Sequence, residues 1–186
     1  DLCDWDVDVP ALESAWVDMV GMLMERIDAV RVKAGHIVRR VADIHATALP
    51  NGESILAVVT EPEELRNAPY AFSVLVPLMS LERYRASLLY TLSRTIGSRS
   101  EMALREAGQA LVDWALTVPD ECVHDILVLL HHRAQSHARE NRVFVPILQT
   151  ILLLLDWDVH KRKSEDVNRM YVIRARAEGR EGVDFW

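Results

Sequence analysis

Hydrophobic and polar positions alternate with a helical period along most of the chain. Over residues 24–48, apolar side chains recur at spacings of three and four, which predicts an amphipathic helix with a buried stripe of Ile27, Val30, Ala34, Ile37, Val38, Val41 and Ile44. The opposite face is expected in solvent and carries Asp28, Arg31, Arg39 and Asp43. Upstream, Pro10 suits the first turn of a shorter partner helix.

The same pattern continues after residue 70. Residues 71–79 and 81–96 form two apolar-periodic segments, and Gly97 is expected to end the second one. The spacing of Ser98 and Glu101 is that of a capping box and predicts the start of the next helix. Its predicted stripe is Ala103, Ala107, Ala110, Leu111, Trp114 and Val118. A further helix is predicted after Pro119, with a stripe of Val123, Ile126, Leu127, Leu130 and Ala134.

Two stretches depart from this pattern. Residues 50–69 carry mixed strand and helix signals and are interpreted as an irregular connector, with a short helix favoured after Pro62. Residues 158–186 are interpreted as a basic helix followed by a glycine-containing tail. The chain begins DLCDWD, without an initiator methionine, so we expect residues 1–186 to form one helical-repeat domain within a longer protein.

The most apolar stretch of the chain is NRVFVPILQTILLLLDW, residues 141–157. A membrane-spanning helix needs about 20 predominantly apolar residues. This stretch is interrupted by Pro146, Gln149 and Thr150 and is followed at once by charged residues. It is therefore expected to be a helix in the core of the protein, and no membrane span is predicted.

Successive helices joined by turns of a few residues stack as antiparallel neighbours. Units of two helices, about 40 residues long, fit the chain and are typical of HEAT repeats. The predicted fold class is therefore all-α, a HEAT- or armadillo-like helical solenoid of antiparallel helix pairs.

Composition and motifs argue against several classes of function. The formal net charge is −7, which argues against a general nucleic-acid binder. Cys3 and Cys122 lie far apart, so neither a disulfide framework nor a zinc site is indicated, and a reducing cytosol is expected. His124, His131, His132 and His137 lack the spacing of metal ligands on one helix. No common phosphate-, zinc- or acyl-transfer motif is found, so no enzymatic activity, metal or cofactor is predicted.

Four arginines are candidates for binding a partner, namely Arg39, Arg40, Arg99 and Arg142. Arg39 and Arg40, with Arg31 and Lys33 nearby, would suit an acidic partner, and the alternative is a charged outer face. Arg99 lies in a predicted turn and is a candidate arginine finger for a GTPase, or else an ordinary loop arginine beside a capping box.

Three segments resemble one known family. ENRVFVPILQTILLLL resembles a segment of tubulin-folding cofactor D in which a polar turn and a Val-Pro pair precede a leucine-rich helix. MERIDAVRVKAGHIVRRV resembles a helix of that family with an Ile-Asp-x-x-Arg core, here Ile27, Asp28 and Arg31. The run from Asn67 to Trp114 resembles a third segment, which leads from a proline-rich start to an amphipathic helix. The order of the three indicates the C-terminal domain of this family.

This resemblance implies a non-enzymatic tubulin chaperone in the cytoplasm, associated with the microtubule cytoskeleton or the centrosome. The implied partners are β-tubulin or the αβ-tubulin dimer, tubulin-folding cofactors E and C, and an Arf-like small GTPase. Two alternatives remain open. One is a contribution to GTPase activation, with Arg99 or Arg142 supplying charge at a helix–helix turn. The other is a generic HEAT scaffold for a different cargo.

Overall fold

A computed structural model describes residues 9–45, 49–98, 101–156 and 161, and every regular element in this part of the chain is helical. The helices follow one another in short steps. They are α1 (Val9–Gly21), η1 (Met22–Met24), α2 (Asp28–His45), α3 (Gly52–Val58), η2 (Pro62–Arg66), α4 (Ala68–Leu75), η3 (Val76–Ser80), α5 (Glu82–Ile96), α6 (Glu101–Thr117), α7 (Asp120–Ser136) and a helix over residues 141–156. The predicted all-α helical-repeat class is confirmed.

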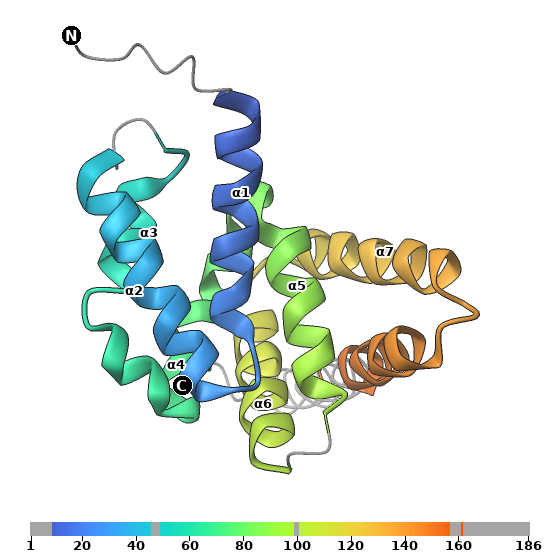
Figure 1. Cartoon of the computed structure of the whole chain (residues 1–186). Helices are drawn as coiled ribbons and strands as arrows, with labels where there is room; N and C mark the ends of the chain where they lie inside the picture. Colours follow the sequence, from blue (N-terminus) through green and yellow to red (C-terminus); the bar gives the residue numbers. More distant parts are fainter. Residues whose placement is uncertain (1–8, 46–48, 99–100, 157–160, 162–186) are drawn as a thin grey trace, which may run out of the picture.

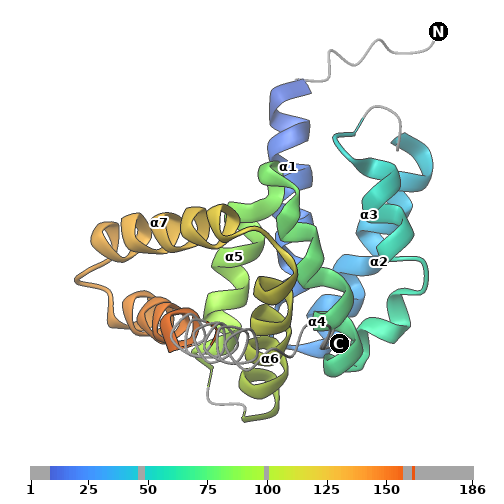
Figure 2. The ribbon, with the colours of Figure 1, turned by 180° about the vertical axis from the view of Figure 1, so that it is seen from behind.

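The helices form a stack that can be followed from one side of the molecule to the other (Figure 1). α2 and α3 lie at one side, α1, α4, α5 and α6 occupy the centre, and α7 pairs with the 141–156 helix at the far side. The view from behind shows the same order (Figure 2). α5 and α6 run antiparallel, as do α7 and the 141–156 helix. α1 departs from strict succession because it packs against α5 as well as α2.

Long-range hydrogen bonds connect α1 and η1 to α5. The indole Nε1 of Trp16 donates to the hydroxyl of Tyr84 over 2.8 Å, and that hydroxyl donates in turn to the carbonyl of Pro50. The hydroxyl of Thr95 donates to the carbonyl of Met24 over 2.8 Å. Trp16, Tyr84 and Met24 are fully buried, so each of these polar groups needs its partner inside the protein.

The stripes predicted for α6 and α7 are largely the faces that the structure buries. α6 buries Ala103, Ala107, Leu111 and Trp114 as predicted, and α7 buries Val123, Ile126, Leu130 and Ala134. The remaining predicted members, Ala110, Val118 and Leu127, are half-buried against the core. Helical periodicity therefore identified the buried faces in this half of the chain.

α2 is turned differently from the sequence prediction. Its buried residues are Arg31, Val32, Ala34, Gly35, Val38 and Ala42. Three members of the predicted stripe, Ile27, Ile37 and Ile44, are instead exposed. The reason is a close approach to η2: a Cβ on Gly35 would lie 2.7 Å from Leu65 Cδ1 and 3.1 Å from Pro62 Cβ. The face of α2 that carries Gly35 therefore packs against η2. The more apolar stripe that was predicted to be buried lies partly in solvent.

Arg31 was predicted in solvent but is only 1% exposed. Its guanidinium donates from Nε to Leu65 O over 3.0 Å, from Nη1 to Glu25 O and Arg26 O over 2.8 and 3.0 Å, and from Nη2 to Arg66 O over 3.4 Å. These carbonyls follow η1 and end η2, where backbone acceptors lack partners within their own helices. Burial lowers the pKa of Arg31, and the nearby Asp28 carboxylate opposes this effect. A buried cation thus joins three elements without a paired carboxylate among the described residues.

The predicted irregular connector at 50–69 is mostly helical, so that part of the prediction is wrong. Asn51 adopts a left-handed conformation with φ of 51° and leads into α3. The short helix favoured after Pro62 is η2. Ile55 and Leu65 are buried, and Arg31 takes up the last carbonyls of η2. Contacts with α2, which no local pattern encodes, therefore order this stretch.

Gly97 ends α5 as predicted, but for a different reason than glycine's freedom to adopt positive φ. Its φ is −78°, which any residue adopts. A Cβ at this position would lie 2.4 to 2.6 Å from three atoms of Pro146. The next helix begins at Glu101, and the Oγ of Ser98 is buried without a hydrogen-bond partner in the described part of the chain. Ser98 is therefore not the predicted cap.

The 141–156 helix is only half in the core. One side buries Pro146, Ile147, Thr150 and Leu154. The other side exposes Val145, Leu148, Leu152 and Leu155, by 38% to 64%. Of the predicted basic helix and tail at 158–186, all but Lys161 lies outside the described residues; the Nζ of Lys161 donates to Asp120 over 2.6 Å.

Candidate partner-binding surface

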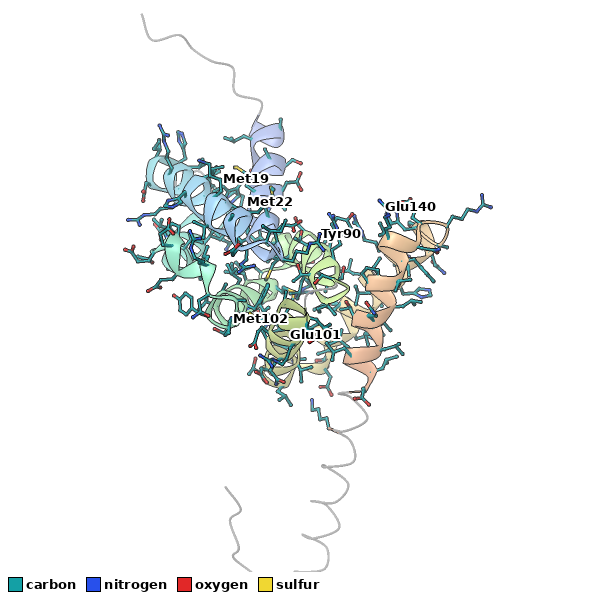
Figure 3. All side chains as sticks on the ribbon, turned by 60° about the horizontal axis from the view of Figure 1, so that its bottom comes forward. Met19, Met22, Tyr90, Glu101, Met102 and Glu140 are labelled. Carbon is teal, nitrogen blue, oxygen red and sulfur yellow. The ribbon has the colours of Figure 1, made fainter. Side chains whose placement is uncertain are left out.

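An apolar groove runs between the end of α1 and the first half of α2. Its volume is about 340 Å³, and it is lined by Met19, Met22, Ala29, Val30, Lys33, Ala34 and Ile37. Met22 is 48% exposed and Ile37 is 41% exposed. Figure 3 labels Met19 and Met22 where α1 lies beside α2. This feature is named the α1–α2 groove below.

Basic and apolar side chains alternate along the outer side of α2. Lys33, Ile37, Arg40 and Ile44 are spaced by four, three and four residues, which places them on one face of the helix. All four are exposed, Ile44 by 66%. Neither Lys33 nor Arg40 has an ion pair with any described residue. These four residues are called the α2 strip, and Lys33 and Ile37 also line the α1–α2 groove.

Arg39, one of the predicted binding residues, belongs to a different face of α2. Its Nη1 donates to the carbonyl of Thr60, and its guanidinium lies 3.9 Å from the Asp43 carboxylate and 4.0 Å from that of Glu61. His36, on the same side, contacts Glu63 over 3.1 Å, and this contact is the main cause that lowers the pKa of Glu63. Arg39 is thus occupied by contacts within the chain, whereas Arg40 is not.

The remaining predicted arginines do not join this surface. Arg142 is exposed in the first turn of the 141–156 helix and forms no ion pair among the described residues. That turn and α2 lie at opposite sides of the molecule (Figures 1 and 2). Arg99 lies outside the described residues. The four predicted arginines therefore do not form one site.

A second pocket, which the sequence did not indicate, lies between α5 and α7. It has a volume of about 270 Å³ and includes Tyr90, Arg133 and His137 in its lining. The guanidinium carbon of Arg133 lies 3.6 Å from the centroid of the Tyr90 ring, and that of Arg94 lies 5.8 Å from it. His137 is bound to Glu140 over 3.0 Å, and Figure 3 labels Tyr90 and Glu140. Stacking of Arg133 on Tyr90 fixes this side chain at the end of α7, where a cation is favoured.

A metal site would need at least three His, Cys, Asp or Glu side chains close together. No such group is found in the part of the chain that the structure describes. His131 and His132 are exposed neighbours with ring centroids 6.1 Å apart. Among the described residues, no helix combines the length and the apolar character needed to cross a membrane.

One comparison decides the family. The family model described as "Tubulin folding cofactor D C terminal" matches residues 13–174 of the chain. The chain belongs to this family. No curated protein and no solved structure matches the chain.

Membership of the cofactor D family bears out the resemblance seen in the three sequence segments and links the chain to tubulin folding in general. The match begins within α1, at residue 13, and includes all later described helices. It therefore contains the α1–α2 groove and the whole α2 strip. The strip was visible in the sequence as cations interleaved with isoleucines, but periodicity alone assigned those isoleucines to the core.

Proposed function

We propose that the chain is a non-catalytic module of a tubulin-folding chaperone that binds β-tubulin or the αβ-tubulin dimer. In this proposal it supports assembly or disassembly of the dimer together with tubulin-folding cofactors E and C and an Arf-like small GTPase. It does so in the cytoplasm, at the microtubule cytoskeleton or the centrosome. The observation that carries the proposal is the family match over residues 13–174.

The surface chemistry supports binding of an acidic protein. The chain has a formal net charge of −7, so attraction to acidic tubulin depends on local basic or apolar surface. The α2 strip supplies both kinds of group, with Lys33 and Arg40 beside exposed isoleucines. A stack of helices also presents an extended surface to a large partner.

Size-exclusion chromatography of the chain with αβ-tubulin tests the proposal. We expect co-elution at low salt and weaker co-elution at moderate salt, because exposed charges are screened as ionic strength rises. A folded, helical chain that never co-elutes with tubulin would contradict tubulin binding. It would favour the alternative of a generic helical scaffold for another cargo.

A second candidate function is a contribution to GTP hydrolysis on tubulin or on the small GTPase. The observation that favours it is the exposed, unpaired state of Arg142 among the described residues. Replacing Arg142 with Ala would then slow hydrolysis by about 10³-fold or more without changing binding. Equal hydrolysis rates would eliminate Arg142 from this role, and Arg99→Ala tests the other predicted arginine in the same assay.

A further inference from the structure

The α1–α2 groove and the α2 strip form one surface, because Lys33 and Ile37 belong to both. We infer that this surface seats an acidic amphipathic α-helix of a protein partner. The inference rests on the proposed function in one respect, since tubulin is the first partner expected to supply such a helix. The residues of the groove and of the α2 strip would recognise this helix.

The apolar floor of the groove fits the apolar face of a helix. Met19, Met22, Val30 and Ile37 line it, and its lining is almost entirely apolar. Methionine side chains are flexible and polarizable, so they adapt to differently shaped apolar residues. Helices that bind in grooves insert side chains at positions i, i+3 or i+4, and i+7. The strip from Lys33 to Ile44 extends about 16 Å at a rise of 1.5 Å per residue, which matches three turns of a partner helix.

The charges at the rim select an acidic helix. Lys33 and Arg40 flank Ile37 and have no carboxylate partner among the described residues. On α1, Asp18 is exposed one turn before Met22, so the charge that α1 carries beside this end of the groove is negative. Opposite charges attract and like charges repel at such a rim. The acidic side of the bound helix is therefore expected over α2 and not over α1.

The contrast with the other side of α2 separates this surface from ordinary exposed charge. Arg39, next to Arg40 in sequence, has two carboxylates within 4.0 Å and donates to a backbone carbonyl. Single exposed cations are common on proteins. Here, however, the unpaired cations alternate with isoleucines exposed by 41% and 66%, beside a methionine exposed by 48%. This mixture of apolar and basic groups is what an acidic amphipathic helix complements.

The test uses the full 186-residue chain and two fluorescent synthetic helices of about 18 residues. Both peptides carry leucines at helical spacing; one has glutamates on its polar face and the other has lysines. Fluorescence anisotropy should show at least about tenfold tighter binding of the acidic peptide, and Lys33→Glu with Arg40→Glu should remove or reverse this preference. Ile37→Asp should abolish binding of the acidic peptide. Matched controls are Arg94→Glu and Leu116→Asp, exposed residues on α5 and α6, which should leave it unchanged.

The outcomes separate this inference from the proposed function. Suppose that the wild-type chain binds tubulin, and that the double variant of Lys33 and Arg40 binds tubulin and both peptides as well as the wild type does. The inference is then overturned and the proposed function stands. If the acidic peptide binds as expected but tubulin never co-elutes, the inference stands and the proposed function fails. If wild-type chain binds neither peptide, or if light scattering shows a dimer that Ile37→Asp dissociates, the surface has another occupant and the inference is overturned.

Discussion

The guanidinium carbon of Arg31 lies 5.3 Å from the centroid of the Phe72 ring. Both side chains are buried, and the guanidinium also donates to backbone carbonyls that follow η1 and end η2. Arg31 therefore connects α2, η1, η2 and α4 through a single side chain. This arrangement explains how a short stretch after α3 becomes ordered without a strong helical pattern of its own.

Replacing Arg31 with Met should destabilise the fold by about 3 kcal/mol, because the buried carbonyl of Leu65 and three part-buried carbonyls lose their donor at once. Arg31→Lys should recover only part of this loss, since an ammonium group cannot reproduce the planar fork of a guanidinium. Urea denaturation followed by circular dichroism measures both effects. Arg40→Met is the control and should change the unfolding free energy by no more than about 0.5 kcal/mol. A wild-type-like Arg31→Met variant would contradict the assigned role.

Replacing Gly97 with Ala should cost about 1–3 kcal/mol, because the new Cβ would overlap Pro146. Trimming Pro146 to Ala should not restore stability in the double variant, since the Pro146 Cα itself would be 2.6 Å from that Cβ. Gly108→Ala is the matched control: its Cβ would lie 3.3 Å from the flexible Leu153 Cδ2, and helix propensity favours alanine by up to about 1 kcal/mol. Thermal unfolding of the three variants measures the contrast. Equal destabilisation by the two glycine substitutions would show that close approach is not the cause.

The Tyr84 hydroxyl makes stability depend on pH in the alkaline range. Burial raises the pKa of Tyr84, and this outweighs the opposing hydrogen bond from Trp16. The unfolded chain therefore loses the tyrosine proton first, near its ordinary pKa of about 10. The stability contributed by the protonated Tyr84 hydroxyl is therefore fully present below that pH, and it is lost as pH rises through the higher folded-state pKa.

Tyr84→Phe should accordingly be less stable than wild type at pH 7 by about 1–2 kcal/mol, because one buried and one part-buried hydrogen bond are lost. The difference should shrink as pH rises above about 10. Urea denaturation at pH 7, 9 and 11 tests this, with Tyr90→Phe as a control that leaves the Tyr84 hydroxyl in place. A difference that stays constant with pH would refute the assignment to Tyr84.

The two sides of the 141–156 helix should respond differently to substitution. Leu154 is fully buried, so Leu154→Ala should cost about 2–5 kcal/mol. Leu152 is 64% exposed, and Leu152→Gln should change stability by no more than about 0.5 kcal/mol. Differential scanning calorimetry distinguishes the two outcomes. A large loss with Leu152→Gln would mean that this side is covered in solution.

The sequence predicted helices well and predicted their orientation unevenly. α6 and α7 carry clean apolar stripes, and their faces were correct because the neighbouring helices lie over those stripes. The orientation of α2 was predicted wrongly because Gly35 and Arg31 contribute nothing to an apolar pattern, yet both lie against η2. Gly97 is a similar case, since its requirement comes from Pro146, 49 residues later.

The candidate surface was predicted only in part, because contacts from distant parts of the chain leave no signal in the local sequence. Arg39 and Arg40 were both predicted as partner-binding residues, and the sequence did not distinguish them, because Glu61 approaches Arg39 from outside the helix. Binding by Arg40 stays a prediction. Ile37 and Ile44 were assigned to the core, since periodicity does not reveal which side of a helix its neighbours cover. The pairing of Tyr90 with Arg133 between α5 and α7 left no local signal at all.

The hydrogen bond between Trp16 and Tyr84 also sets an order of events during synthesis on the ribosome. The two residues are 68 positions apart, and α1 packs against the helix that carries Tyr84. At a synthesis rate of about 5–20 residues per second, the nascent chain carries Trp16 for roughly 3–14 s before Tyr84 is made. The apolar side of α1 therefore lacks its main neighbour during that interval. In this member of a family of tubulin-folding proteins, α1 thus stays incompletely packed until a residue 68 positions later has been synthesised.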